Sequence, residues 1–290
     1  MMSKHLAMER FGQDAVLLLH GLSGSPLEMQ YLEHRIREAG FYTRNPSIPG
    51  CGFGTREDRF DTGTWRQWIE FASSELDALR RNHERVYIAG LCIGAVIALR
   101  LAIERPHQVA GLGLVSTTLA YDGWQIPWYQ ALAPLACYTP LRRIISWPER
   151  HPFGLKNERL RKWVVRALHA RGVSALGAAS QPLSGIDEAR KLIRAVRRDI
   201  HCVMAPALIL HSIEDDVTST RSAHFVALNV SSRQVRTVLY RDSYHILSMD
   251  NDRRSVAKEM IGFFRNMADA QASRPEETGL GEKSEQLFAA

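Results

Sequence analysis

The chain alternates short, almost continuously apolar runs with stretches whose apolar residues recur at helical spacing. Residues 14–20 form the first such run and end at Gly21, as expected of a strand that is buried on both faces of a sheet. Pro26 then opens a helical pattern that Gly40 closes. Further strands are predicted at 41–48, 85–89, 109–116, 207–212 and 235–240, and further helices at 64–82, 93–105, 219–229 and 252–267.

This alternation predicts an α/β fold with a mostly parallel central sheet and helices on both of its faces. The order of the strands does not follow from it. Residues 118–200 depart from the pattern, because they contain four tryptophans and six prolines but no clear strand, and they are predicted to form a mostly helical insertion. We therefore expect a core made of residues 1–117 and 201–270, the insertion, and a polar, disordered tail over 271–290.

Composition limits the classes of protein that remain. The 290 residues, 45% of them hydrophobic, can bury one large core. The N-terminus lacks the apolar segment of an export signal, and Arg100 interrupts the apolar run after Gly90, so we expect a cytoplasmic protein without a transmembrane segment. The four cysteines form no CxxC pair and no ligand spacing with histidine. We expect neither a zinc site nor a disulfide framework, and no metal or cofactor.

The segment YIAGLCIG carries the clearest chemical signal. A strand runs into Gly90, Cys92 and Gly94, and a helical pattern follows directly. Strand, Gly-x-nucleophile-x-Gly turn and helix make up a nucleophile elbow, whose centre is usually serine. Here the centre is a thiol. The alternative interpretation is a small buried hydrophobic residue, but the two glycines at elbow spacing favour a nucleophile.

Four segments, HGLSGSP, GLCIG, SIEDDVT and SYHILSMD, occur in an order that resembles the α/β-hydrolase superfamily. The chain is most similar to its capped carboxylesterases and monoacylglycerol lipases over roughly residues 13–268. The resemblance implies an α/β-hydrolase fold with the elbow near the middle of the sheet and a helical cap insertion, 118–200, over the site. It also implies the chain order nucleophile, acid, histidine.

The resemblance assigns roles to five residues of this sequence. Cys92 takes the position of the nucleophile, Asp215 that of the acid after the penultimate strand, and His245 that of the base after the last strand. The backbone N–H groups of Leu22 and Ile93 are implied as the oxyanion hole. In this arrangement His245 accepts the thiol proton, Asp215 holds the imidazole tautomer, and the helix dipole favours the thiolate.

Some alternatives and departures accompany these assignments. Asp216 and Glu214 compete with the predicted acid, and His20 is interpreted as a brace of the oxyanion loop. Tyr244 stands before the histidine, where the family usually has glycine. Cys51 lies in a Gly-Cys-Gly turn that the family often writes Gly-His-Gly, so this thiol is expected to lie near the site.

A thiol nucleophile affects the choice of substrate. Attack on an oxygen ester must produce a thioester of higher acyl-transfer potential, whereas attack on a thioester exchanges one sulfur for another. The sequence therefore predicts hydrolysis of a small-molecule ester or thioester through a covalent acyl-enzyme. An acyltransferase or aminoacyl shuttle that acts on thioesters of carrier proteins or coenzyme A is the first alternative. A binding or receptor-like protein that kept the fold without turnover is the second.

Charge adds a clue about partners. The chain carries a formal net charge of +6, and cations are concentrated in the insertion. They fit an acidic acyl or peptidyl carrier protein, the phosphates of coenzyme A or an anionic membrane surface, but a solvated helical face explains them equally well. Nucleic acid is not expected, because no binding motif accompanies the charge. The cations are Arg142, Arg143, Arg150, Lys156, Arg159, Arg161, Lys162, Arg166, Arg171, Arg190, Lys191, Arg194, Arg197 and Arg198.

Overall fold

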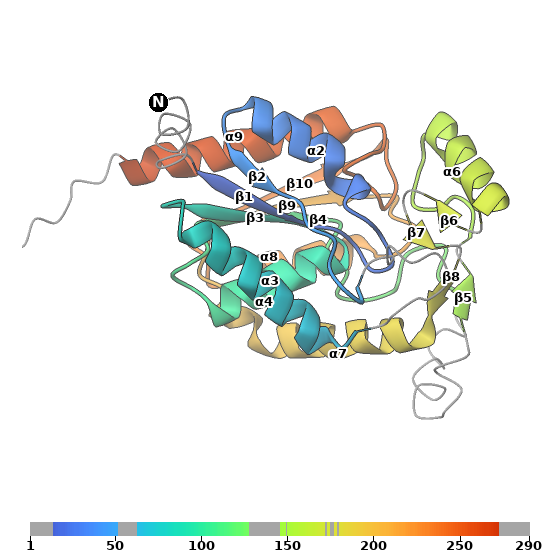
Figure 1. Cartoon of the computed structure of the whole chain (residues 1–290), viewed down its shortest axis with the longest axis horizontal. Coiled ribbons are helices and arrows are strands. Elements are labelled where there is room, and N and C mark those ends of the chain that lie inside the picture. The colour runs from blue at the N-terminus through green and yellow to red at the C-terminus, as the bar shows by residue number, and fades with distance from the viewer. Residues whose placement is uncertain are drawn as a thin grey trace, which may run out of the picture.

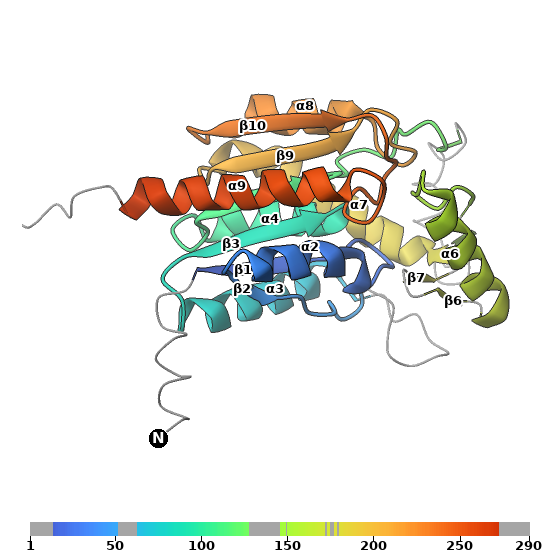
Figure 2. The same cartoon turned by 90° about the horizontal axis from the view of Figure 1, so that it is seen from above.

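A single parallel sheet forms the centre of the protein (Figures 1 and 2). The computed structural model describes residues 14–51, 63–127, 146–148, 150–171, 173–174, 177–178 and 180–272. Six strands pair in the order β10-β9-β4-β3-β1-β2, and every pairing among them is parallel. The strands are β1 (Ala15–Leu19), β2 (Tyr42–Arg44), β3 (Val86–Leu91), β4 (Gly111–Val115), β9 (Ala207–Ser212) and β10 (Val235–Tyr240).

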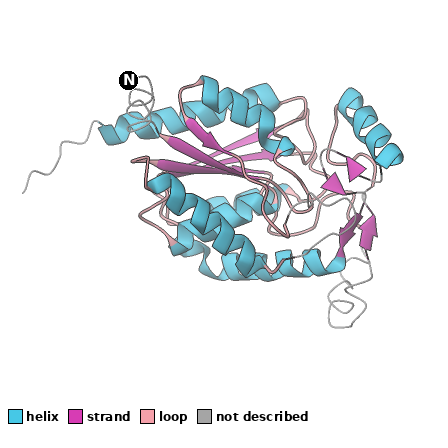
Figure 3. Ribbon diagram, in the orientation of Figure 1, coloured by secondary structure: helices cyan, strands magenta, loops and turns pink. Residues whose placement is uncertain are grey.

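Helices cover both faces of this sheet (Figure 3). On one face lie α2 (Leu27–Glu38) and α9 (Arg253–Ala272). On the other lie α3 (Trp65–Arg80), α4 (Ile93–Glu104) and α8 (Thr220–Asn229). The predicted α/β-hydrolase architecture is therefore confirmed, and β1, β3, β4 and β9 are buried along their whole length, as their continuous apolar runs indicate.

One predicted strand is much shorter than its apolar run. Residues 41–48 were predicted to be extended, but only Tyr42–Arg44 pair with β1. Pro46 and Pro49 follow closely, and proline has no N–H to donate to a neighbouring strand. The chain therefore leaves the sheet after Arg44 and returns toward the end of β1.

The segment between β4 and β9 contains α6 (Glu158–Arg171), α7 (Leu183–Asp199) and a 3₁₀ turn, Ile200–Cys202. It also contains two short antiparallel pairs that the sequence did not predict. These are β5 (Ser146–Pro148) with β8 (Ser180–Pro182), and β6 (Val173–Ser174) with β7 (Gly177–Ala178). Helix α6 and the short strands lie beyond the C-terminal ends of the central strands, whereas α7 runs back beneath α4 (Figure 1).

The predicted boundary between core and cap, at residue 200, follows α7, a helix that packs against the core. The apolar face of α7 joins the main hydrophobic core through Ile186, Leu192 and Val196. The boundary at residue 200 thus stays a prediction, with α7 as the part of the cap that packs on the core. Of the predicted tail, residues 271–272 complete α9 and residues 273–290 lie outside the described part of the chain. No helix within the described ranges is long and apolar enough to cross a bilayer.

Candidate active site

The turn between β3 and α4 holds Cys92 in a strained backbone conformation. Its φ of 56° and ψ of −117° are rarely adopted by a residue with a side chain. Two glycines make the turn possible: a Cβ on Gly90 would lie 2.4 Å from the carbonyl carbon of Gly94, and one on Gly94 would lie 2.2 Å from the carbonyl oxygen of Leu19. The turn places the thiol at the N-terminus of α4, where the helix dipole favours a negative charge.

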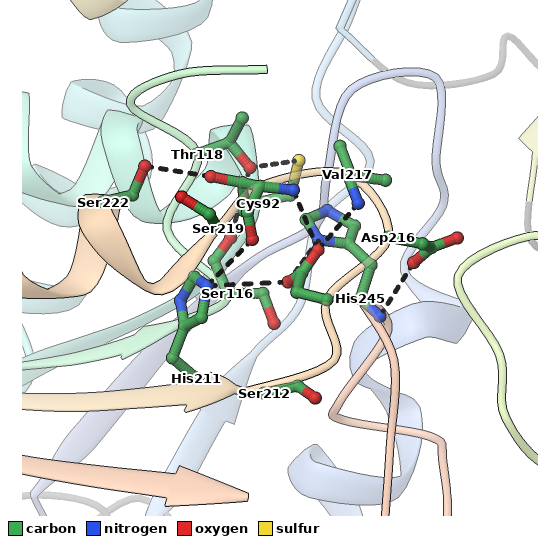
Figure 4. Close-up of polar contacts among 12 residues, drawn as sticks. Cys92, Ser116, Thr118, His211, Ser212, Asp216, Val217, Ser219, Ser222 and His245 are labelled. Carbon is green, nitrogen blue, oxygen red and sulfur yellow. Dashed lines mark hydrogen bonds and ion pairs between the residues drawn. The ribbon is translucent and has the colours of Figure 1, made fainter. Parts of the chain in front are cut away.

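His245 and Asp215 form a buried pair beyond the C-terminal ends of the strands, where Cys92 also lies. The imidazole Nδ1 lies 2.9 Å from each carboxylate oxygen. This contact assigns the tautomer, since Nδ1 donates its proton to the carboxylate and Nε2 is left to accept one. Nε2 is buried and has no hydrogen-bond partner. Figure 4 shows the imidazole beside Cys92.

The charges of the three groups are coupled. Burial alone lowers the pKa of His245, but the negative charges of Asp215 and Cys92 outweigh it, so the pKa of the imidazole lies well above its ordinary value. Burial raises the pKa of Asp215, whereas the positive charge and hydrogen bond of His245 lower it, and the net pKa lies below the ordinary value. The Asp215 carboxylate therefore stabilises the positive charge that the imidazole gains when Nε2 accepts a proton.

Asp215 is also fixed by hydrogen bonds from residues other than His245. Its Oδ1 accepts the backbone N–H groups of Val217 and Thr218, each at 2.9 Å. His211 of β9 lies 3.8 Å from Oδ2 and donates from Nε2 to the Thr218 carbonyl oxygen. A carboxylate fixed by two N–H donors has little freedom to turn, and it holds the imidazole of His245 in one orientation.

The two competing acids have other partners. Asp216 does not contact the imidazole; it accepts the backbone N–H of His245 at 3.2 Å and that of Gly154 at 3.1 Å. Burial, reinforced by the neighbouring Asp215 carboxylate, raises the pKa of Asp216. Glu214 points outward and binds the ammonium of Lys156 at 3.0 Å. Only Asp215 among the three adjacent acids pairs with the histidine ring.

The loop that contains Leu22 is fixed by side chains around it. The ring of His20 joins two backbones, donating from Nδ1 to the Gly21 carbonyl oxygen at 2.8 Å and accepting the Ile48 N–H at Nε2 at 2.9 Å. Burial lowers the pKa of His20 to about 4, which keeps the ring neutral and this bridge intact at neutral pH. His20 thus has the bracing geometry that the sequence suggested.

Two further groups hold the same loop, and sequence reasoning missed one of them. Glu28 accepts the Gly21 N–H at 2.9 Å, and its position in the first turn of α2 was the available signal. The Cys51 carbonyl oxygen accepts the Ser23 N–H at 2.7 Å. Burial, and then the nearby charges of Cys92 and Glu28, raise the pKa of the Cys51 thiol well above its usual value. Cys51 is therefore a neutral, packed thiol next to the site.

The two predicted oxyanion-hole N–H groups flank Cys92. Ile93 follows it directly, and the loop of Leu22 packs so closely that a Cβ on Gly21 would lie 3.3 Å from the Cys92 Cβ. Neither N–H donates to an acceptor within the described residues. The assignment of these two groups as the oxyanion hole stays a prediction.

The loop around His245 is joined to the cap by Asp250, another residue that the sequence did not single out. Its Oδ2 accepts the N–H groups of Lys156 and Tyr244 at 2.7 and 2.8 Å, and its Oδ1 those of Asn157 and Asn251 at 2.8 and 3.0 Å. The N–H of Tyr244, which stands where the family has glycine, is therefore used to hold the loop. Its ring meets that of Trp124 edge to face, 5.6 Å between centroids.

Helix α6 rests on the same loop. Its residues Leu160 and Val164 pack in a small apolar cluster with Ile246 and Met249, which follow His245. The outward face of α6 carries Arg159, Lys162, Trp163 and Arg166, all exposed. One face of α6 thus packs on the loop that carries the candidate base, His245, and another face of the same helix is exposed and basic.

The part of the chain that the structure describes contains no group of three or more potential ligands that could hold a metal ion. Cys51, Cys92 and Cys202 are free thiols.

Comparisons with known proteins agree with the fold. A profile of the family described as "Serine aminopeptidase, S33" matches residues 12–252. A thermostable monoacylglycerol lipase of a Bacillus species is 24% identical over 257 residues, 89% of this chain and 92% of that protein. A carboxylesterase of Bacillus subtilis is 20% identical over 88% of this chain and 94% of its own length. The crystal structure of a monoacylglycerol lipase from Paleococcus ferrophilus covers 89% of this chain and 97% of its own, with a TM-score of 0.71 at 18% identity.

Proposed function

Because this chain belongs to the α/β-hydrolase family described as serine aminopeptidase, S33, we propose that it hydrolyses carboxylic esters or thioesters. A lipase and an esterase are among the relatives of the chain. The proposed reaction proceeds through a covalent acyl-enzyme. Cys92 is the nucleophile of this proposal, His245 the base and Asp215 the residue that orients the base. The family's description names serine, so the thiol sets this chain apart.

The observation that carries the proposal is the buried pairing of His245 with Asp215 beside a thiol on a strained elbow. An imidazole whose Nδ1 is fixed by a carboxylate presents Nε2 as a proton acceptor. A cysteine with a purely structural role would not require a positive φ. It would also not require glycines at two flanking positions where a Cβ would clash.

The reaction then proceeds in two halves. The Cys92 proton passes to Nε2 of His245 as sulfur attacks the acyl carbon, and the N–H groups of Leu22 and Ile93 stabilise the tetrahedral oxyanion. The oxyanion collapses, the C–O or C–S bond of the substrate breaks, and His245 gives its proton to the leaving alcohol or thiol. Water, deprotonated by His245, attacks the acyl-enzyme and releases the acid while Cys92 regains its proton.

Thioesters are the preferred substrates under this proposal. Sulfur-for-sulfur exchange is nearly balanced in free energy, whereas acylation by an oxygen ester is uphill. A reducing cytoplasm would keep Cys92 free, so the predicted location remains part of the proposal.

Intact-mass spectrometry after mixing the protein with an S-acyl thioester and its matched oxygen ester tests this function. We expect a single acyl adduct on Cys92, formed faster from the thioester, and its loss in water as free acid appears. An adduct that persists in water and loses its acyl group only to an added thiol or amine would identify an acyltransferase. No adduct and no turnover with either substrate would contradict the proposal and favour a non-catalytic binding protein.

Acyl transfer with a carrier protein is a second candidate, and the exposed basic face of α6 favours it. Arg159, Lys162 and Arg166 stand out from a helix that packs on the loop of His245. An acidic carrier that delivers a thioester to Cys92 would meet these charges first, and charge attraction raises the rate of encounter more than the strength of the final contact.

Reversal of two of these charges tests the second candidate. Arg159→Glu with Lys162→Glu should lower kcat/KM for an acyl-carrier protein about tenfold at low salt, with a smaller effect as salt screens the encounter. A small neutral thioester should react as before. The matched control is Arg81→Glu with Arg233→Glu. These two exposed cations precede β3 and β10, at the N-terminal ends of the strands, whereas Cys92 follows the C-terminal end of β3. Equal losses in both double variants, or none in either, would leave hydrolysis of small substrates as the function.

A further inference from the structure

The Cys92 thiol is hydrogen-bonded to Thr118, one of several polar groups around it. Its Sγ lies 3.3 Å from the hydroxyl oxygen of Thr118. Nε2 of His245, another of these groups, has no hydrogen-bond partner. Figure 4 shows the Thr118 hydroxyl directed at the sulfur, with His245 on another side of it. The resting thiol is thus turned toward Thr118.

The turn that carries Thr118 is rigid and fully buried. Ser116 has a φ of 45° and donates its N–H to the Leu210 carbonyl oxygen at 2.8 Å. On the other side, the Leu119 N–H donates to the hydroxyl of Ser222 at 3.2 Å. Thr118 itself is inaccessible to solvent. Its hydroxyl is therefore held at a fixed point next to the sulfur.

The hydroxyl has one proton and two acceptors within reach. It lies 3.2 Å from the Ser116 carbonyl oxygen, in a geometry that allows donation. When Cys92 is a thiol, S–H donates to the Thr118 oxygen, and the hydroxyl donates to Ser116. When Cys92 is a thiolate, sulfur only accepts, and the hydroxyl must turn to donate to it. A hydrogen bond to a charged acceptor is stronger than one between neutral groups, so the second arrangement favours the thiolate.

We propose that Thr118 is a positioning residue that holds the Cys92 sulfur at rest and stabilises it by donating a hydrogen bond once its proton has moved to His245. The proposal rests on the function above in naming Cys92 as the nucleophile. No atom is gained or lost: the thiol proton passes to Nε2, and the hydroxyl proton changes only the acceptor to which it points. The same donor is available when the thiolate leaves the acyl group in the second half of the reaction.

Thr117 provides a matched control within the same turn. It is a second fully buried threonine, and its hydroxyl has no hydrogen-bond partner. Thr117→Val and Thr118→Val therefore make the same chemical change one residue apart, and only the second removes a contact with sulfur. Thr118→Ser retains the hydroxyl and should retain its effect.

Alkylation by iodoacetamide measures the thiolate without requiring any ester turnover. Cys92 is 9% exposed, and exposed Cys202 serves as the internal reference thiol. Peptide mass spectrometry would follow both sites as a function of pH. In Thr118→Val we expect the midpoint for Cys92 to move up by about one pH unit, a tenfold loss of rate below it, while Cys202 is unchanged. Thr118→Ser and Thr117→Val should match the wild type.

Two results would overturn the proposal: a wild-type profile for Thr118→Val, or an equal shift in Thr117→Val. If Thr118→Val fails to fold, the comparison of Thr118→Ala with Thr118→Ser gives the same decision. Because the readout is alkylation, absence of ester hydrolysis would overturn the proposed function and still leave the role of Thr118 decided.

Discussion

Replacing Cys92 with alanine is expected to lower kcat for thioester and ester substrates by about 10⁴-fold or more, and to abolish the acyl adduct. The change removes the nucleophile, and removal of one member of a catalytic unit costs nearly as much as removal of all. Steady-state kinetics with intact-mass detection measure both effects. Cys202→Ala, which removes an exposed thiol, is the control and should behave as wild type. Substantial turnover in Cys92→Ala would exclude the mechanism.

Cys92→Ser gives a graded version of the same experiment. The base and the oxyanion donors stay in place, and a hydroxyl forms an oxygen ester as intermediate. Oxygen-ester hydrolysis should therefore persist at a reduced level, and the preference for thioesters over matched esters should fall. A preference unchanged by the substitution would show that the thioester selectivity comes from the pocket and not from sulfur.

Asp215→Ala is expected to lower kcat/KM by about 10³-fold or more. It removes the acceptor of the His245 Nδ1 proton from a buried pair at 2.9 Å and leaves the imidazole free to turn. Glu214→Gln is the matched control, because it neutralises an adjacent acid whose partner is Lys156 at the surface. It should change kcat/KM by no more than about twofold, as is usual for a surface substitution.

Asp215→Asn separates orientation from charge. The amide oxygen can still accept from Nδ1, so we expect an activity between those of Asp215→Ala and the wild type. Because the Asp215 charge raises the pKa of His245, its removal should lower that pKa, and the pH at which the imidazole loses its proton should fall. NMR titration of His245 would measure this shift. Equal activities of Asp215→Ala and Glu214→Gln would contradict the assignment of the acid.

Local patterns in the sequence determined the class of fold and pointed to Cys92 as the proposed nucleophile. β9 is buried along its whole length, so it is mostly apolar and has the bounds that its apolar run predicted. The edge strand β10 is largely exposed, and it also has its predicted bounds. The elbow is equally local. Gly90 and Gly94 are needed because the turn at Cys92 brings backbone atoms within Cβ distance, and this requirement is written within five residues.

The family resemblance proposed Asp215 among three adjacent acids, and only the tertiary structure shows what each of them contacts. Residues 214–216 are three acids in a row, and composition does not distinguish them. They differ because successive side chains leave the loop in different directions. Asp215 faces the ring of His245, Asp216 faces two backbone N–H groups, and Glu214 faces Lys156 at the surface. All of these partners lie more than twenty-five residues away in the chain, so the contacts themselves cannot be read from the local sequence.

The same reason explains what sequence reasoning missed. The strand pair β5 and β8 joins segments separated by more than thirty residues, and each is too short to show a period of its own. Thr118 follows a predicted strand as one hydroxyl residue among three, Ser116 to Thr118. Only the fold brings its oxygen within 3.3 Å of a sulfur 26 residues earlier. Periodicity and turn chemistry are local and can be read from the sequence, whereas a contact between distant segments exists only once the sheet has brought their ends together.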